Sequence, residues 1–167
     1  MKLLPATASL LAALTATSLT VAEAYAADTI VGVWKLLSYI SRDEETGIET
    51  KPWGENPEGL LMYTADGYMS GVGVAEGRTA PTGTGEKLTE ERAKLFTSMT
   101  AYAGRYTVEL DRVIHHVEVA WNPAWNGTDQ IRYVTFQGDT IRIRTPVVVS
   151  TVDGRKRTFM LQFRRLR

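Results

Sequence analysis

Short segments in which hydrophobic residues alternate with polar ones dominate this chain after residue 30. Such alternation, repeated at nearly regular spacing with turn residues between the segments, is typical of an antiparallel barrel or sandwich. The clearest turn is Ala65-Asp66-Gly67, because Asp-Gly readily adopts the positive φ of a tight hairpin. The pattern predicts about eight strands, at residues 31–40, 59–64, 68–74, 105–110, 113–120, 129–136, 140–145 and 158–166.

One segment has a helical pattern instead. Thr89 can cap the N-terminus of a helix, and the two glutamates that follow it suit the positive end of the helix dipole. Gly104 can end the helix. The apolar residues at helical spacing are Leu95, Phe96, Met99, Tyr102 and Ala103. We therefore predict one helix between Thr89 and Gly104 that packs on the barrel or covers it as a lid.

Residues 1–26 have the features of a secretory signal peptide. Lys2 gives a positive start, a mostly apolar stretch follows, and Ala24-Tyr25-Ala26 forms an Ala-rich cleavage site that resembles those of bacterial export signals. The apolar stretch is shorter than the roughly 20 residues of a membrane-spanning helix. We therefore expect cleavage after Ala26, a periplasmic or secreted protein without a membrane anchor, and one domain over residues 27–167.

Composition excludes several classes of function. The chain has no cysteine, and its 19 basic residues balance its 19 acidic ones. The missing thiols rule out a disulfide framework, a lipid-anchored cysteine and a thiolate nucleophile. The balanced charge argues against a nucleic-acid partner. The sequence also lacks a Gly-x-Ser-x-Gly elbow and any nucleotide-binding glycine motif, so we expect no cofactor.

Residues 115–128 hold both histidines of the chain and two of its four tryptophans. Neighbouring residues on a strand point to opposite faces, so His115 and His116 cannot bind one metal ion without a bulge. With no cysteine and no third histidine, we expect no metal site. The residues that share the more apolar face with His115 are Val113, Val117 and Val119. We therefore expect His115 inside the barrel and His116 outside, and His115 is either a buried structural histidine or a functional one.

The two ends of the domain carry a pair of residues that fit each other. Gly32-Val33-Trp34 begins the first strand, and Arg165 lies near the end of the last strand. A barrel closes by pairing its first and last strands, which would bring Arg165 close to Trp34. A guanidinium over an indole adds about 1 kcal/mol, so we expect both residues to be structural. In these features the chain resembles the calycin and lipocalin superfamily of ligand-binding barrels.

The chain also resembles the bacterial and fungal lipocalin-like domain family over nearly all of residues 27–167. The stretches that carry this resemblance are 32–39 (GVWKLLSY), 59–70 (GLLMYTADGYMS), 102–106 (YAGRY), 115–118 (HHVE), 123–128 (PAWNGT), the Gly138-Asp139 turn and Thr145-Pro146. Two features depart from the family pattern: Ala124 stands where asparagine is usual, and the loop around residues 78–85 matches weakly. The resemblance implies a lipocalin-type fold. It leaves activity open, because some lipocalin-like proteins resemble isomerases or cyclases that act on hydrophobic intermediates.

We therefore predict an all-β, antiparallel lipocalin-like β-barrel of about eight strands with one short α-helix, as a monomer or weak homodimer. A barrel of this size can hold one small ligand. Our hypothesis is that it binds a small, largely hydrophobic molecule, with Tyr63, His115, Trp121 and Trp125 lining the site. The alternative is a lyase- or isomerase-type enzyme acting on such a molecule. In that case His115 would be the acid or base, and Tyr63 or Glu118 would orient the substrate.

Overall fold

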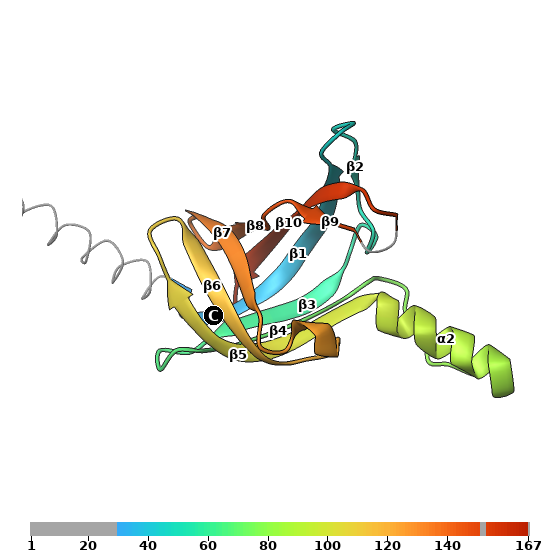
Figure 1. The fold of residues 1–167 in the computed structure, drawn as a ribbon. Coiled ribbons are helices and arrows are strands. Elements are labelled where there is room, and N and C mark those ends of the chain that lie inside the picture. The colour runs from blue at the N-terminus through green and yellow to red at the C-terminus, as the bar shows by residue number, and fades with distance from the viewer. Residues whose placement is uncertain (1–29, 151–152, 167) are drawn as a thin grey trace, which may run out of the picture.

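The computed structural model describes residues 30–150 and 153–166, and ten strands and one longer helix lie within these ranges (Figure 1). The predicted signal peptide at residues 1–26 lies outside the described residues. In the described part of the chain, no helix is long and apolar enough to cross a membrane. In chain order the elements are β1 (Gly32–Asp43), β2 (Glu49–Thr50), β3 (Glu58–Tyr63), β4 (Tyr68–Val74), α2 (Gly85–Thr97), β5 (Met99–Val108), β6 (Arg112–Ala120), the 3-10 turn η1 (Pro123–Trp125), β7 (Asp129–Gln137), β8 (Thr140–Arg144), β9 (Val148–Val149) and β10 (Lys156–Arg165).

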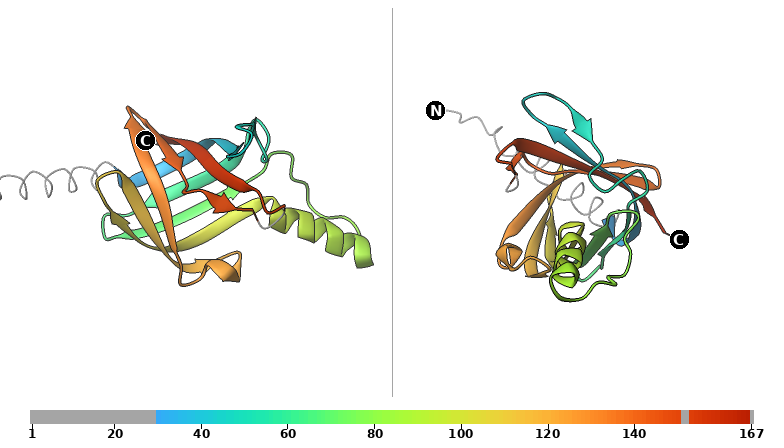
Figure 2. Two further views of the ribbon diagram at one scale, coloured as in Figure 1. Left: turned by 45° about the horizontal axis from the view of Figure 1, so that its top comes forward. Right: turned by 90° about the vertical axis from the view of Figure 1, so that its right-hand side faces the viewer.

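Eight of these strands form a closed antiparallel barrel, which confirms the predicted fold. Their order around the barrel is β1-β3-β4-β5-β6-β7-β8-β10, and β10 pairs back with β1. The two-residue strands β2 and β9 pair only with the outer ends of β1 and β10. Both views in Figure 2 show the strands wrapped around one common axis. The Asp-Gly hairpin lies between β3 and β4 as predicted, with Gly67 at φ +89°.

The predicted helix is misplaced by several residues. Helix α2 begins at Gly85 and ends at Thr97, whereas Met99–Val108 forms strand β5. The apolar spacing through Tyr102 is compatible with a helix, but this segment gains a full row of backbone hydrogen bonds between β4 and β6 as a strand. Tertiary pairing therefore overrides the local pattern.

Gly104 has a different role from the helix end that we predicted for it. It lies opposite a bulge in β6, where its partner is Val117 while the preceding Ala103 pairs with Val119. A Cβ atom at Gly104 would lie only 2.0 Å from the carbonyl oxygen of His116. Only glycine allows the two backbones to approach this closely.

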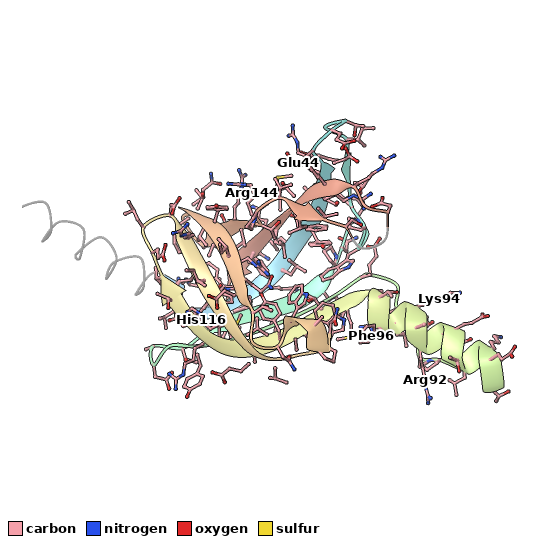
Figure 3. The ribbon with its side chains drawn as sticks, viewed as in Figure 1. Glu44, Arg92, Lys94, Phe96, His116 and Arg144 are labelled. Atoms are coloured by element: carbon pink, nitrogen blue, oxygen red, sulfur yellow. The ribbon has the colours of Figure 1, made fainter. Side chains whose placement is uncertain are left out.

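Helix α2 projects from one end of the barrel rather than packing along its side (Figures 1 and 2). None of its residues is buried. Its contact with the barrel lies at its C-terminal end, where Phe96, labelled in Figure 3, has its ring centroid 6.2 Å from that of Trp121. The indole N–H of Trp121 also donates to the Phe96 carbonyl at 3.3 Å. The helix therefore neither packs along the barrel nor covers it as the predicted lid would.

The opposite end of the barrel is closed by the pair expected from the sequence. Trp34 and Arg165 are cross-strand partners, and the guanidinium carbon lies 4.1 Å from the centre of the indole. The indole N–H of the fully buried Trp34 donates to the Ile30 carbonyl at 2.8 Å. Arg165 in turn donates to the Val31 carbonyl at 2.6 Å. These contacts attach the residues before β1 to the last strand.

Replacing Arg165 by methionine tests this closure. The R165M variant keeps an aliphatic chain but loses the cation–π contact and a charged hydrogen bond, so its free energy of unfolding should fall by about 2 kcal/mol. Urea denaturation followed by circular dichroism measures the change. The control is R164M, since Arg164 is exposed on the other face of the same strand; it should change the free energy by less than about 0.5 kcal/mol. Equal effects of the two variants would contradict a specific role for Arg165.

Candidate ligand cavity

A cavity of about 580 Å³ lies inside the barrel, farther along β1 from the end that Trp34 closes. Its lining combines residues from most strands of the barrel with residues from the β6–η1 segment and the Pro146–Val148 region. The volume is within the usual range for small-molecule sites. Strand β4 contributes two glycines, Gly71 and Gly73, to the lining. A Cβ at Gly73 would come within 2.6 Å of the Trp53 ring, so glycine leaves room for that indole.

Two groups of aromatic rings border this cavity. In the first group, Tyr39 stacks on Trp53 with centroids 4.3 Å apart and on Phe159 with centroids 5.4 Å apart. In the second group, Trp125 makes edge contacts with Trp121 at 4.9 Å and with Tyr102 at 5.4 Å. We name these the Tyr39 stack and the Trp125 cluster. Aromatic surfaces of this kind offer large, rigid contact area to a planar ligand.

The four ligand-lining residues that we predicted occupy two different places. Trp121 and Trp125 line the cavity. Tyr63 and His115 are not among the residues that line it, and their side chains are 2% and 0% exposed. The sequence reasoning did not include Tyr39, Trp53, Tyr102 or Phe159. Alternation along β10 could have indicated the inward direction of Phe159. Tyr39 points inward only because the register of β1 shifts between Leu36 and Ser38, and no local signal predicts this shift or the position of the loop residue Trp53.

A chain of hydrogen bonds connects the buried histidine to the cavity. The Tyr63 hydroxyl lies 2.7 Å from Nε2 of His115, and the Tyr102 hydroxyl lies 2.8 Å from Nδ1. Burial, with smaller contributions from the charges of Arg132 and His116, holds the pKa of His115 well below its usual value. The imidazole is therefore neutral at pH 7, and it donates to one tyrosine and accepts from the other. Since Tyr102 borders the cavity, His115 reaches the cavity only through the Tyr102 hydroxyl.

The other residues considered for chemistry lie on the outside of the barrel. His116, labelled in Figure 3, contacts Asp129 through Nδ1 at 2.7 Å and Thr107 through Nε2 at 2.8 Å. Glu118 is exposed and forms an ion pair with Arg105 at 3.9 Å, so it cannot orient a molecule in the cavity. Val119 is 60% exposed, because the bulge in β6 reverses the alternation that predicted it inside. Within residues 30–150 and 153–166, no three His, Asp or Glu side chains come together as a metal site.

A positively charged side chain also enters the cavity. Arg132 on β7 borders it and is only 8% exposed. Its guanidinium donates to the Ile131 carbonyl at 2.9 Å and reaches the Gln130 amide oxygen at 3.5 Å. Its charge also acts on the ionisation of Tyr39, Tyr63 and His115. The lining of the cavity is thus largely apolar, and its charged residues are Arg132 and Asp129.

The neutral state of His115 has a consequence for stability. In the unfolded chain, histidine takes up a proton near its usual pKa of 6.5, and folded His115 does not. The free energy of unfolding should therefore fall as the pH drops below about 6.5, with a contribution approaching 1.4 kcal/mol per pH unit. In an H115Q variant, this part of the pH dependence of the free energy of unfolding should be absent, as measured by urea denaturation between pH 7 and 5. The matched variant H116Q should retain it. If the free energy of unfolding changed with pH equally in H115Q and the wild type, His115 would be protonated in the folded state.

Comparison with known proteins agrees with this architecture. The family model described as "Lipocalin-like domain" matches residues 31–166. A curated relative, the 4'-hydroxy-3'-methoxypropiophenone carrier protein of Aspergillus oryzae, is 38% identical over 76 residues, which cover 40% of this chain and 68% of that protein. A solved structure described as EF1p2_mFAP2b bound to DFHBI covers 87% of this chain and 98% of its own, with 11% identity and a TM-score of 0.40, which is too low to support an argument. Because the family model matches most of its length, the chain belongs to the lipocalin-like domain family.

Proposed function

We propose that this protein is an exported carrier that binds one small, largely hydrophobic molecule in the barrel cavity. The observation that carries the proposal is the cavity of about 580 Å³, which is lined by the Tyr39 stack and the Trp125 cluster. Aromatic groups in the lining favour a molecule with a flat ring, which can stack or make edge contacts with them. The name of the Aspergillus relative supports the same class of ligand, since its propiophenone is a small substituted arene.

Direct acid–base chemistry by His115 has less support from the geometry. Both ring nitrogens of His115 are occupied by tyrosine hydroxyls, and the ring does not border the cavity. A catalytic group must come within hydrogen-bond reach of the proton that it moves. An isomerase or lyase built on this site would therefore have to use the Tyr102 hydroxyl, with His115 behind it. Binding without chemical conversion is the function that we propose.

Ligand titration tests the proposal. We expect 4'-hydroxy-3'-methoxypropiophenone, or another member of a panel of aromatic metabolites and fatty acids, to change the tryptophan fluorescence saturably, because three of the four tryptophans border the cavity. Calorimetry should show binding weakened about tenfold in W125L, which loses a large contact surface.

The control for this titration is Y68L, since Tyr68 is an aromatic residue exposed on the outer face of the barrel. It should bind as the wild type does. The absence of any fluorescence change across the whole panel would refute the carrier function. Chemical conversion of a bound compound, detected by mass spectrometry of the ligand, would favour the enzyme instead.

Export gives a separate prediction. If residues 1–26 are a signal peptide, the intact mass of protein isolated from the periplasmic or culture fraction of its native host should correspond to a chain that begins at Ala27. The small-x-small sequence at residues 24–26 sets this position. Protein recovered from the cytosol with residues 1–26 still attached would contradict the exported carrier, although not ligand binding itself.

A further inference from the structure

The described structure provides no anionic partner for the charge of Arg132. No aspartate or glutamate side chain within residues 30–150 and 153–166 forms an ion pair with it. Its protein hydrogen bonds go to two neutral oxygens on its own strand, the Ile131 carbonyl and the Gln130 amide. Asp129, three residues earlier on β7, is also among the residues that line the cavity. Its side chain is 64% exposed, however, and its carboxylate oxygen Oδ1 contacts Nδ1 of His116 on the outside of the barrel.

The guanidinium of Arg132 cannot become neutral by losing its proton, because arginine stays charged in proteins. The neighbouring titratable groups do not compensate it either. Burial raises the pKa of Tyr39 and of Tyr63, so both phenols are neutral at pH 7, and His115 is neutral as well. No carboxylate within the described residues forms an ion pair with this buried cation. A buried charge without a counter-charge is unfavourable, and a ligand that supplies the counter-charge recovers part of the desolvation cost.

A second polar atom at the same cavity also lacks a partner. The hydroxyl oxygen of Thr100 is buried and makes no hydrogen bond within the described residues. Thr100 lies on β5 and borders the cavity, as does Tyr102 two residues later on the same strand. A hydroxyl can donate to an acceptor oxygen, as a guanidinium does. A cation without a counter-charge and a hydroxyl without a hydrogen bond thus belong to two residues that line one cavity, whose remaining surface is mostly aromatic and aliphatic.

We infer that the ligand is a planar aromatic molecule that carries an anionic oxygen, either a carboxylate or an ionised phenol, and that Arg132 binds this oxygen. This inference rests on the proposed carrier function and specifies its ligand. The ring of the ligand occupies the space between the Tyr39 stack and the Trp125 cluster. Its anionic oxygen accepts hydrogen bonds from the guanidinium of Arg132. Charge-assisted hydrogen bonds to a guanidinium are stronger than neutral ones, so charge discriminates between otherwise similar arenes.

Two pairs of probes test this inference by calorimetry at pH 7. The first pair is 2-naphthoate and the neutral 2-naphthamide, which share one ring system. The second pair is 4'-hydroxy-3'-methoxypropiophenone and its O-methyl ether, which cannot ionise. In at least one pair, the acidic member should bind wild-type protein about tenfold more tightly than its neutral partner. The pair that shows the preference identifies the source of the anionic oxygen, carboxylate or phenolate.

The variant R132M, which keeps the length and removes the charge, should abolish this preference and leave binding of the neutral members within about twofold. R132K should retain part of the preference, since it keeps the charge but not the planar donor geometry. The matched control is R142M, because Arg142 is exposed on the outer face of β8 and does not border the cavity. It should preserve both the affinity and the preference.

Thermal unfolding of the ligand-free variants separates a binding role from a structural one. If Arg132 serves the ligand, R132M should unfold at the same temperature as the wild type or a higher one, because an uncompensated buried charge has been removed. Should R132M not fold, R132Q takes its place in the binding assay. Neutral probes that bind as tightly as their acidic partners, in wild type and R132M alike, would overturn the inference and leave the carrier function intact. If no probe of either pair or of the wider panel binds, both proposals fail.

Discussion

The structure depends on the pairing of its first strand with its last. Strand β1 pairs with β10 from Trp34 and Arg165 at one end to Asp43 and Arg157 at the other. This pairing converts an open antiparallel sheet, with two exposed edges, into a barrel without free edges. A closed barrel has an inside, and its inward side chains are shielded from solvent whether they are apolar or not. The burial of a histidine and an arginine follows from this closure.

The interior is filled unevenly along the barrel axis. At the end closed by Trp34, large apolar side chains pack together, among them Ile30, Phe136 and Ile141. The hydrogen-bonded chain Tyr63–His115–Tyr102 begins at this end, where Tyr63 pairs with Gly32, and it reaches the cavity at Tyr102. Its imidazole is fully buried. Beyond it lies the cavity with its two aromatic groups and Arg132. Burial keeps the imidazole of His115 neutral, and a tyrosine hydroxyl at each ring nitrogen holds the ring in place. Because Tyr102 lines the cavity and His115 does not, a ligand meets the tyrosine rather than the histidine.

The alternation of residues predicted much of this arrangement. It gave the approximate positions of the eight barrel strands, the Asp-Gly hairpin, the contact of Trp34 with Arg165, and the inward direction of His115. These features depend on the two-residue repeat of a strand and on local turn preferences, and both are determined by residues that are neighbours in the sequence. Predictions failed where long-range pairing opposed the local pattern. Residues 99–104 have apolar spacing that fits a helix, and they form a strand because two neighbouring strands supply hydrogen bonds on both sides.

The sequence by itself thus determined the barrel, its closure, the membership of the family and the burial of one histidine. The tertiary structure decided which side chains share the cavity. Trp53 and Phe159 are more than a hundred residues apart in the sequence, and both stack on Tyr39. Nothing in the sequence distinguishes Arg132 from other charged residues on strands. Only the closed barrel shows that it is a buried cation without an ion pair to any acidic residue of the described chain. The physical reason is that strand alternation specifies the direction of a side chain locally, whereas its neighbours depend on how distant strands pair around the barrel.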